Sequence, residues 1–129
     1  MDIVFNHLQK SSKAEGKVFM GDMNLITEDD PIDLPAGWKD SWLVLHPTDP
    51  GLTYDVKRNT LVRKFQSRLD RVFVFEEPNF QLRSIEMVGT EEIEDGLFVS
   101  DHFGLFTTFE IPNATICPPS PISDDCVVI

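Results

Sequence analysis

Apolar residues are most concentrated between positions 68 and 75, where few polar residues interrupt Leu69, Val72, Phe73, Val74 and Phe75. Such a run is typical of a strand buried on both faces. Shorter apolar segments at 17–20, 52–55 and 103–111 predict three more strands. The segment 80–88 alternates, with Phe80, Leu82 and Val88 in one phase and Ile85 and Met87 in the other, and it predicts a less central strand.

Two helices are expected. Across residues 2–13 the helical spacing involves Ile3, Val4, His7 and Leu8, and Asp2 is positioned to cap the start. Residues 38–45 predict a short amphipathic helix, whose apolar positions are Trp38, Trp42, Leu43 and Leu45. The polar segments 27–37 and 57–66 are expected to be exposed loops.

The folded part is expected to end near residue 111. Aromatic residues are spread from Phe5 to Phe109, and none follows. From Pro112 onward the chain has four prolines, scattered Ser and Asp, and no periodicity. The composition therefore predicts a folded portion at 1–111 and a flexible tail at 112–129.

The formal net charge of −11, with 22 acidic and 11 basic residues, works against a large nonspecific surface for nucleic acid. It leaves open a narrow cleft in which a metal ion supplies the positive charge. Both cysteines lie in the tail, and neither a signal peptide nor an apolar run long enough to span a membrane is apparent. An intracellular protein is expected, in the nucleus or cytoplasm.

Three polar clusters stand at predicted strand ends: Asp22 with Asn24, Asp70 between two arginines, and Asp101 with His102. Side chains at strand ends are open to a cleft while the sheet holds them rigid. Each cluster also has a simpler interpretation. A Gly-Asp-x-Asn sequence is commonly just a turn, an Arg-x-Asp-Arg sequence a surface ion pair, and an Asp-His pair a chance occurrence.

In combination and in this order, the clusters resemble the C-terminal half of the endonuclease/exonuclease/phosphatase superfamily. Within it the likeness is strongest to the tyrosyl-DNA phosphodiesterases of the second type, which clear 5′-phosphotyrosyl ends from DNA. The similar segments are Gly21-Asp22-Met23-Asn24-Leu25, Leu34-Pro35-Ala36-Gly37-Trp38, Thr53-Tyr54-Asp55, Arg68-Leu69-Asp70-Arg71-Val72 and Ser100-Asp101-His102-Phe103-Gly104-Leu105. The resemblance covers about residues 1–111. It implies a DNase I-like fold: the C-terminal half of a four-layer α/β sandwich, with mostly antiparallel sheet and flanking helices.

The resemblance also implies a Mg²⁺-dependent hydrolase, with Mn²⁺ as the alternative ion, and a role for each cluster. Asp22 would be the base that positions the attacking water, and Asn24, two residues on in an extended segment, would point the same way. His102 would stabilise the phosphoryl oxygens, and Asp70 would fix the orientation of its imidazole. Asp101 would contribute to the metal site, directly or through water.

Two substrate-binding residues, Tyr54 and Arg68, are weaker inferences from the same resemblance. The family has aromatic residues in its substrate groove at the positions of Tyr54 and Leu69. Tyr54 keeps a ring, whereas Leu69 does not, and Leu69 is expected to belong to the core. The implied partner is a DNA end that carries a 5′-phosphotyrosyl adduct.

The family's early Asn and its metal-binding Glu have no counterpart in residues 1–16. The chain is therefore expected to begin partway through the domain, with low stability or self-association and with impaired activity. The last four residues, Cys126-Val127-Val128-Ile129, fit a prenylation pattern, which would make the protein membrane-associated. Two alternatives stay open: a relative acting on phosphoinositides or sphingolipids, and a non-catalytic, membrane-tethered remnant.

Overall fold

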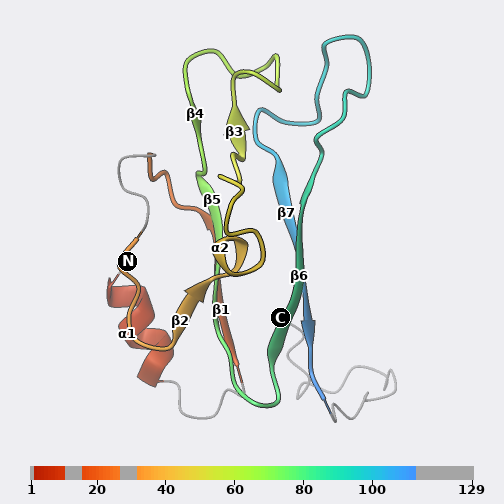
Figure 1. Cartoon of the computed structure of the whole chain (residues 1–129). Coiled ribbons are helices and arrows are strands. Elements are labelled where there is room, and N and C mark those ends of the chain that lie inside the picture. The colour runs from red at the N-terminus through yellow and green to blue at the C-terminus, as the bar shows by residue number, and fades with distance from the viewer. Residues whose placement is uncertain (1, 11–15, 27–31, 113–129) are drawn as a thin grey trace, which may run out of the picture.

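The computed structural model describes residues 2–10, 16–26 and 32–112 of the chain (Figure 1). None of the helices in these ranges is long and apolar enough to cross a membrane. Cys126 and residues 113–129 lie outside the described residues, so prenylation and the predicted tail stay predictions. In chain order the elements are α1 (Asp2–Lys10), β1 (Lys17–Asp22), β2 (Trp38–Asp40), α2 (Ser41–Leu45), β3 (Tyr54–Asp55), β4 (Gln66–Ser67), β5 (Asp70–Phe75), β6 (Gln81–Val88) and β7 (Gly104–Glu110).

Strand β5 is the centre of a three-stranded sheet, with β1 on one side and β2 on the other. Strands β6 and β7 form a hairpin, and β3 pairs with β4 over two residues. Every strand pairing among the described residues is antiparallel. The predicted α/β class, with mostly antiparallel sheet and flanking helices, is confirmed.

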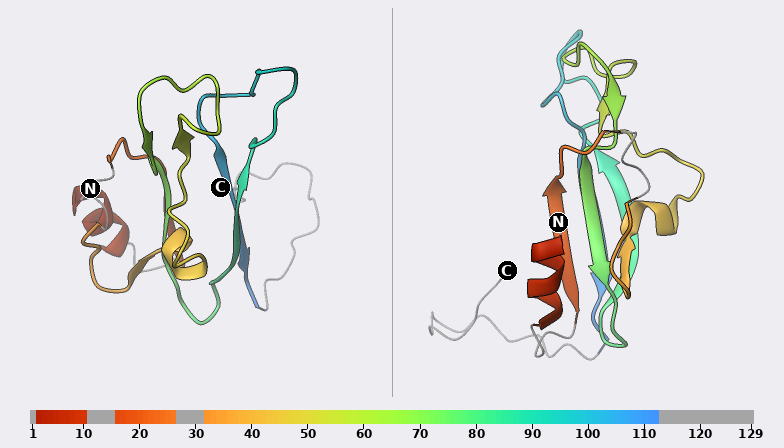
Figure 2. Two further views of the ribbon diagram at one scale, coloured as in Figure 1. Left: turned by 45° about the horizontal axis from the view of Figure 1, so that its top comes forward. Right: turned by 90° about the vertical axis from the view of Figure 1, so that its left-hand side faces the viewer.

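The three-stranded sheet is covered on both faces, as the apolar run at 68–75 predicts. On one face Phe73 packs with Phe5 of α1 and Trp38 of β2. On the other face Val72 packs with Ile85 of the β6–β7 hairpin and with Trp42 of α2. Figures 1 and 2 accordingly show α1 and the β6–β7 hairpin on opposite sides of β1 and β5. The centre of β5 is therefore the core of the molecule.

The buried face of α1 differs from the prediction. Ile3 is 85% exposed and His7 is also exposed, whereas Phe5 is buried and Leu8 packs beside it. Phe5 makes edge-on contacts with Phe19, Trp38 and Phe73 at ring-centroid distances of 5.4, 4.8 and 5.7 Å. Three consecutive apolar residues allow more than one helix face, and packing with these rings selects the face of Phe5.

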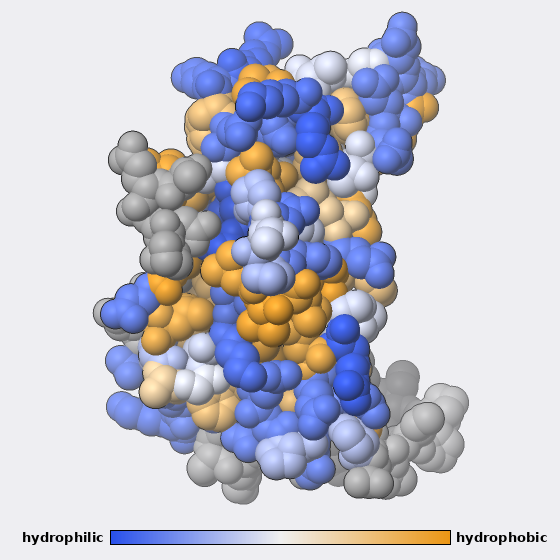
Figure 3. Space-filling model, viewed as in Figure 1, coloured by the Kyte–Doolittle hydropathy of each residue, from blue (hydrophilic) through white to orange (hydrophobic). Residues whose placement is uncertain are grey.

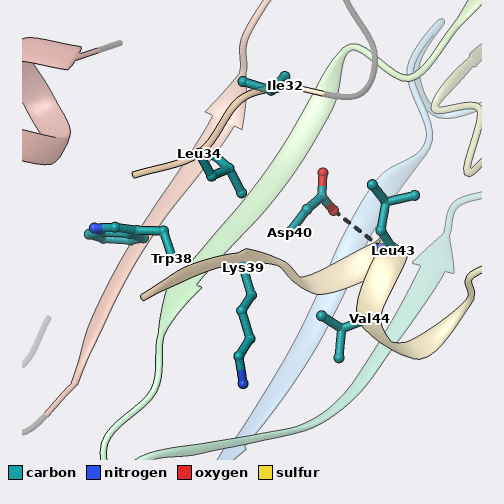
Figure 4. Close-up of a pocket in the computed structure, with 7 residues that line it drawn as sticks. All are labelled: Ile32, Leu34, Trp38, Lys39, Asp40, Leu43 and Val44. Atoms are coloured by element: carbon teal, nitrogen blue, oxygen red, sulfur yellow. Dashed lines mark hydrogen bonds between the residues drawn. The ribbon is translucent and has the colours of Figure 1, made fainter. Parts of the chain in front are cut away.

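The predicted helix at 38–45 is divided into a strand and a shorter helix. Trp38 pairs with Phe75 in β2, and α2 begins only at Ser41. Asp40 ends the strand and caps the helix, because its Oδ1 accepts the backbone N–H groups of Trp42 and Leu43 at 3.1 and 3.3 Å. Figure 4 shows the bond between Asp40 and Leu43, two residues that line an apolar pocket of about 290 Å³; none of the predicted site residues lines this pocket.

Apolar side chains gather on the surface over α2, as Figure 3 shows. Val44 and Leu45 of this helix are exposed. Nothing in the described chain packs over these two side chains to bury them fully.

A bulge changes the phase of β6. The pairing with β7 shifts between Leu82 and Ser84, so the strict alternation predicted for 80–88 does not hold. Leu82 and Ile85, which alternation places on opposite faces, are both buried. An extra residue in one strand has this effect, since the side-chain period of a strand is two.

Glu76 links β2 to β6, and its titration gives a pH-dependent prediction. Its carboxylate accepts a hydrogen bond from the ammonium group of Lys39, and its Oε1 accepts another from the backbone N–H of Leu82 at 3.0 Å. The bond from Lys39 is the main reason that the pKa of Glu76 lies below its usual value of 4.5, although burial opposes the shift. A lowered pKa stabilises the fold at pH above 4.5, and this contribution is lost as the pH falls through the folded-state value.

Glu76→Gln is therefore expected to lower the free energy of unfolding by about 0.2–1 kcal/mol at pH 7, the range for a partly exposed ion pair. At pH 3 the difference from wild type should shrink. Denaturant unfolding at the two pH values measures both, with Glu86→Gln on the exposed side of β6 as the control. An equal loss at pH 3 and pH 7 would show that charge is not the cause.

Candidate active site

Asp22, the last residue of β1, forms a turn with Asn24. Asp22 is exposed, and its Oδ1 accepts the backbone N–H of Asn24 at 2.8 Å. Its Oδ2 accepts the side-chain Nδ2 of Asn24 at 3.2 Å. Asn24 has a φ of 51°, so the segment is not extended as predicted. The two side chains meet because the backbone turns back, a conformation that Asn tolerates better than most residues.

Strand register brings this turn to the start of β5. Asp22 is the partner of Asp70 across the β1–β5 ladder. Directly paired residues of antiparallel strands place their side chains on the same face. The backbone N–H of Met23 also donates to the carbonyl of Leu69 at 2.8 Å. The two carboxylates therefore lie on the same side of the sheet, at the same end.

His102 joins the site from the segment before β7. Its Nδ1 lies 2.8 Å from Oδ2 of Asp70, with the two side chains 26% and 25% exposed. The backbone N–H of His102 donates to Oγ of Ser100 at 3.1 Å, which closes a local turn. A pocket of about 340 Å³ opens beside the pair; it is lined by Asp70, Val88, Gly89, Val99, Ser100, His102, Phe103 and Gly104. The imidazole is thus held by a carboxylate at the edge of an open pocket.

Aromatic rings extend from His102 toward the surface. Tyr54 lies 5.1 Å from the His102 ring, between centroids, and Phe65 lies 5.0 Å from Tyr54. Phe65 is 43% exposed. Leu69 is buried, as expected for a core residue. Phe65 therefore supplies a ring beside Tyr54, although Leu69 has none.

Asp101 is exposed at the same loop, with its Oδ1 3.5 Å from Oγ of Ser100. Within residues 2–10, 16–26 and 32–112, no three His, Cys, Asp or Glu side chains are grouped so that they could hold a metal ion. Mg²⁺ commonly takes one or two carboxylates from a protein and keeps several waters. An exposed carboxylate such as that of Asp101 fits as one such ligand, but the described residues do not form a complete metal centre.

Arg68 does not occupy the position predicted for a substrate-binding residue. Its side chain is 2% exposed, and its Nη1 donates to Oδ1 of Asp40 at 2.8 Å. Nη1 of Arg71 lies 3.6 Å from Oδ2 of the same carboxylate, and this side chain is also buried. A buried guanidinium held by a carboxylate is not presented to a substrate. The simpler interpretation of the Arg-x-Asp-Arg sequence as a surface ion pair is also wrong, since both arginines are internal.

Two buried polar residues next to the site, Thr53 and Asn59, were missed by sequence reasoning. Oγ1 of Thr53 accepts the N–H of Asp70, and Nδ2 of Asn59 donates to the carbonyl of Ser100. Asn59 and Val62 are buried, which corrects the expectation of a fully exposed loop at 57–66. Thr53 stands in a segment that the family resemblance includes, but nothing in its sequence context indicates what its hydroxyl binds.

No protein-family model matches the chain. Among curated proteins, it is 31% identical over 122 residues to tyrosyl-DNA phosphodiesterase 2 (TDP2) of Gallus gallus, a match that covers 86% of this chain and 32% of the relative. It is 32% identical over 117 residues to the Rattus norvegicus protein, covering 84% of this chain and 31% of the relative. The chain thus spans about a third of the length of the curated relatives it matches.

Solved structures give the same relationship. The D. rerio TDP2 complexed with single strand DNA product matches with a TM-score of 0.72 and 27% identity, over 84% of this chain and 47% of that one. TDP2 from Caenorhabditis elegans matches with a TM-score of 0.66 and 26% identity, over 84% and 34% of the two chains. The predicted resemblance is confirmed: over most of its own length this chain is similar to tyrosyl-DNA phosphodiesterase 2, and it has part of the DNase I-like fold expected from the resemblance to the endonuclease/exonuclease/phosphatase superfamily.

Proposed function

We propose that this chain contributes part of a Mg²⁺-dependent phosphodiesterase site that removes 5′-tyrosyl adducts from DNA ends. It supplies Asp22 as the base, and His102 with its partner Asp70. The observation that carries the proposal is the hydrogen-bond distance of 2.8 Å between His102 and Asp70, with Asp22 paired to Asp70 in the strand register. The similarity to tyrosyl-DNA phosphodiesterase 2 supports the reaction type and the DNA-repair role. An intracellular place of action follows from that role.

Asp22 acts on the attacking water in this proposal. Water attacks phosphorus in line with the bond to the tyrosyl oxygen, and the Asp22 carboxylate takes the water proton. The phosphorus–oxygen bond to tyrosine then breaks, which leaves a 5′-phosphate on the DNA. A phenol of pKa about 10 is a good leaving group, so the departing oxygen needs little help from an acid. Asn24 holds the carboxylate of Asp22 through both of its hydrogen bonds.

His102 faces the phosphoryl oxygens. Because Nδ1 is held by Asp70, Nε2 is the nitrogen left to face the substrate, and the imidazolium form donates to a non-bridging oxygen. A donor fixed where negative charge develops stabilises the transition state without reorganisation during the step. When bound near Asp101, Mg²⁺ or its alternative Mn²⁺ supplies further positive charge to the phosphate.

The substrate contact proposed for Tyr54 is supported by its neighbour Phe65. With a net charge of −11, the chain offers DNA little electrostatic attraction. Stacking of a base on an aromatic ring contributes about 1–3 kcal/mol to the binding of a single strand, in addition to any attraction between charges. The ring of Tyr54 contacts His102, and the ring of Phe65 contacts Tyr54 and is exposed to solvent. Bases next to a 5′ phosphate bound at His102 could therefore stack on these rings.

A substrate comparison tests the proposal. The chain is incubated with Mg²⁺ and a 5′-phosphotyrosyl oligonucleotide, and released tyrosine and the 5′-phosphate oligonucleotide are quantified. Parallel reactions use an inositol polyphosphate and sphingomyelin vesicles. Slow release from the oligonucleotide alone, abolished by EDTA, is the expected result, because the described residues supply only part of a metal centre. Hydrolysis of the inositol polyphosphate or of sphingomyelin, with none of the oligonucleotide, would favour a relative that acts on phosphoinositides or sphingolipids. If the folded chain hydrolysed none of the three substrates, a non-catalytic role would be favoured.

A further inference from the structure

We infer that Thr53 is a positioning residue that sets Asp70 and His102 in register with each other; the inference rests on the proposed function. The Thr53 side chain is fully buried. Its Oγ1 accepts the backbone N–H groups of Leu69 and Asp70 at 3.1 and 3.0 Å. Its own carbonyl accepts the N–H of Phe103, the residue after His102, at 2.7 Å. One residue thus contacts the backbone of both segments that form the pair.

The hydroxyl takes the place of a missing strand neighbour. Strand β1 pairs with β5 along residues 70–75, but β2 pairs only with residues 73–75. At the start of β5, where Asp70 lies, no described strand continues the sheet on the side of β2. Buried backbone N–H groups need acceptors, and a hydroxyl oxygen has two lone pairs with which to accept two of them. Thr53 therefore fixes the backbone from which the Asp70 carboxylate projects.

Asn59 holds the other end of the His102 segment. It is buried, and its Nδ2 donates to the carbonyl of Ser100 at 2.8 Å. Its Oδ1 accepts the N–H of Leu61 at 3.0 Å, and its own N–H donates to the carbonyl of Asp55 at 2.9 Å. The segment from Ser100 to Phe103 is consequently held at both ends by the single short segment 53–59.

This attachment matters because the histidine itself is weakly fixed. About a quarter of each side chain in the pair is exposed, and within the described part of the chain the Nδ1–Oδ2 bond is the only hydrogen bond of either side chain. A bond so open to water does not hold a loop by itself. Displacement of a reacting group by about 1 Å can cost 10²-fold in rate. The position of the loop is therefore set by the buried bonds of Thr53 and Asn59.

The test compares Thr53→Val, which removes the hydroxyl, with Thr53→Ser, which keeps it. Thr107→Val is the matched control, since Oγ1 of Thr107 is buried and has no hydrogen-bond partner among the described residues. In hydrolysis of the 5′-phosphotyrosyl oligonucleotide, Thr53→Val should lower kcat about 10- to 100-fold with little change in KM. Thr53→Ser should restore most of kcat, and Thr107→Val should resemble wild type.

A second readout does not need activity. In NMR spectra Thr53→Val should shift the His102 ring signals and speed hydrogen exchange at the Phe103 amide, which bonds to the unchanged carbonyl of Thr53. Unaltered kcat and His102 signals in a folded Thr53→Val variant would overturn the inference, even if Asp22→Ala abolishes hydrolysis and so upholds the proposed function. If the wild-type chain releases no tyrosine, the proposed function fails, and the His102 and Phe103 signals alone decide for or against positioning by Thr53.

Discussion

Asp40→Ala is expected to lower the free energy of unfolding by about 3–5 kcal/mol, the usual cost of removing one partner from a buried ion pair. The Asp40 carboxylate is buried between the guanidinium groups of Arg68 and Arg71. It also caps α2 through the N–H groups of Trp42 and Leu43. Alanine removes the charge and the cap together. Since a domain is stable by only about 5–15 kcal/mol, much of the total would be lost.

Asp40→Asn separates the two effects, because an amide oxygen still caps the helix but carries no charge. It should unfold at lower denaturant concentration than wild type and at higher concentration than Asp40→Ala. Asp33→Ala, which removes an exposed carboxylate, is the control and should stay within about 0.5 kcal/mol of wild type. A loss below about 1 kcal/mol in Asp40→Ala would contradict a structural role for the carboxylate.

Asp22→Ala is expected to reduce hydrolysis of a 5′-phosphotyrosyl oligonucleotide by about 10²–10⁴-fold, the usual contribution of a general base. Asp22 is exposed, and its carboxylate bonds only to Asn24 among the described residues. Its removal should therefore change stability little, and the rate loss should appear without unfolding. Single-turnover rates and a denaturation curve on the same preparation measure both quantities.

Asp22→Asn keeps the size of the side chain. Its rate of hydrolysis should be nearly as low as that of Asp22→Ala, because an amide does not accept the water proton. Asp33→Ala again serves as the control, with an unchanged rate expected. Wild-type hydrolysis by a folded Asp22→Ala variant would remove Asp22 from the mechanism and would require another base.

Strands β1, β5, β6 and β7 were predictable because their signals are local, whereas β2 lies in a segment predicted as a helix and β4 begins in one predicted as a loop. The apolar run that ends in Val74 and Phe75 indicates burial on both faces, and β5 is buried on both. The Gly21-Asp22 step ends an apolar strand by its own turn chemistry. The face of α1 was not predictable, since Ile3 and Phe5 are equally apolar, and only the rings of the sheet choose between them.

In the candidate site, too, features with a local signal in the sequence were predictable and features that depend on distant contacts were not. Its side chains stand at strand ends that local patterns reveal, so their positions in the sequence could be named. Their support could not be, because it depends on contacts between distant residues. Arg68 bonds to Asp40, which is 28 residues away in the sequence, and Asp70 bonds to Thr53, which is 17 residues away. A surface role for Arg68 is the natural expectation for a charged residue, and burial beside a carboxylate becomes visible only once the chain is folded.

The most direct test of the central claim, that separate strand ends bring Asp70 and His102 together as one catalytic unit, is a double-mutant cycle. Hydrolysis rates are measured for wild type, Asp70→Asn, His102→Ala and the double variant. Because Asp70 acts only through the imidazole, we expect the rate of the double variant to equal that of His102→Ala within about twofold, which is the usual error of such comparisons. A double variant slowed by the product of the two single effects would show that the two side chains act independently, and would contradict the site described here.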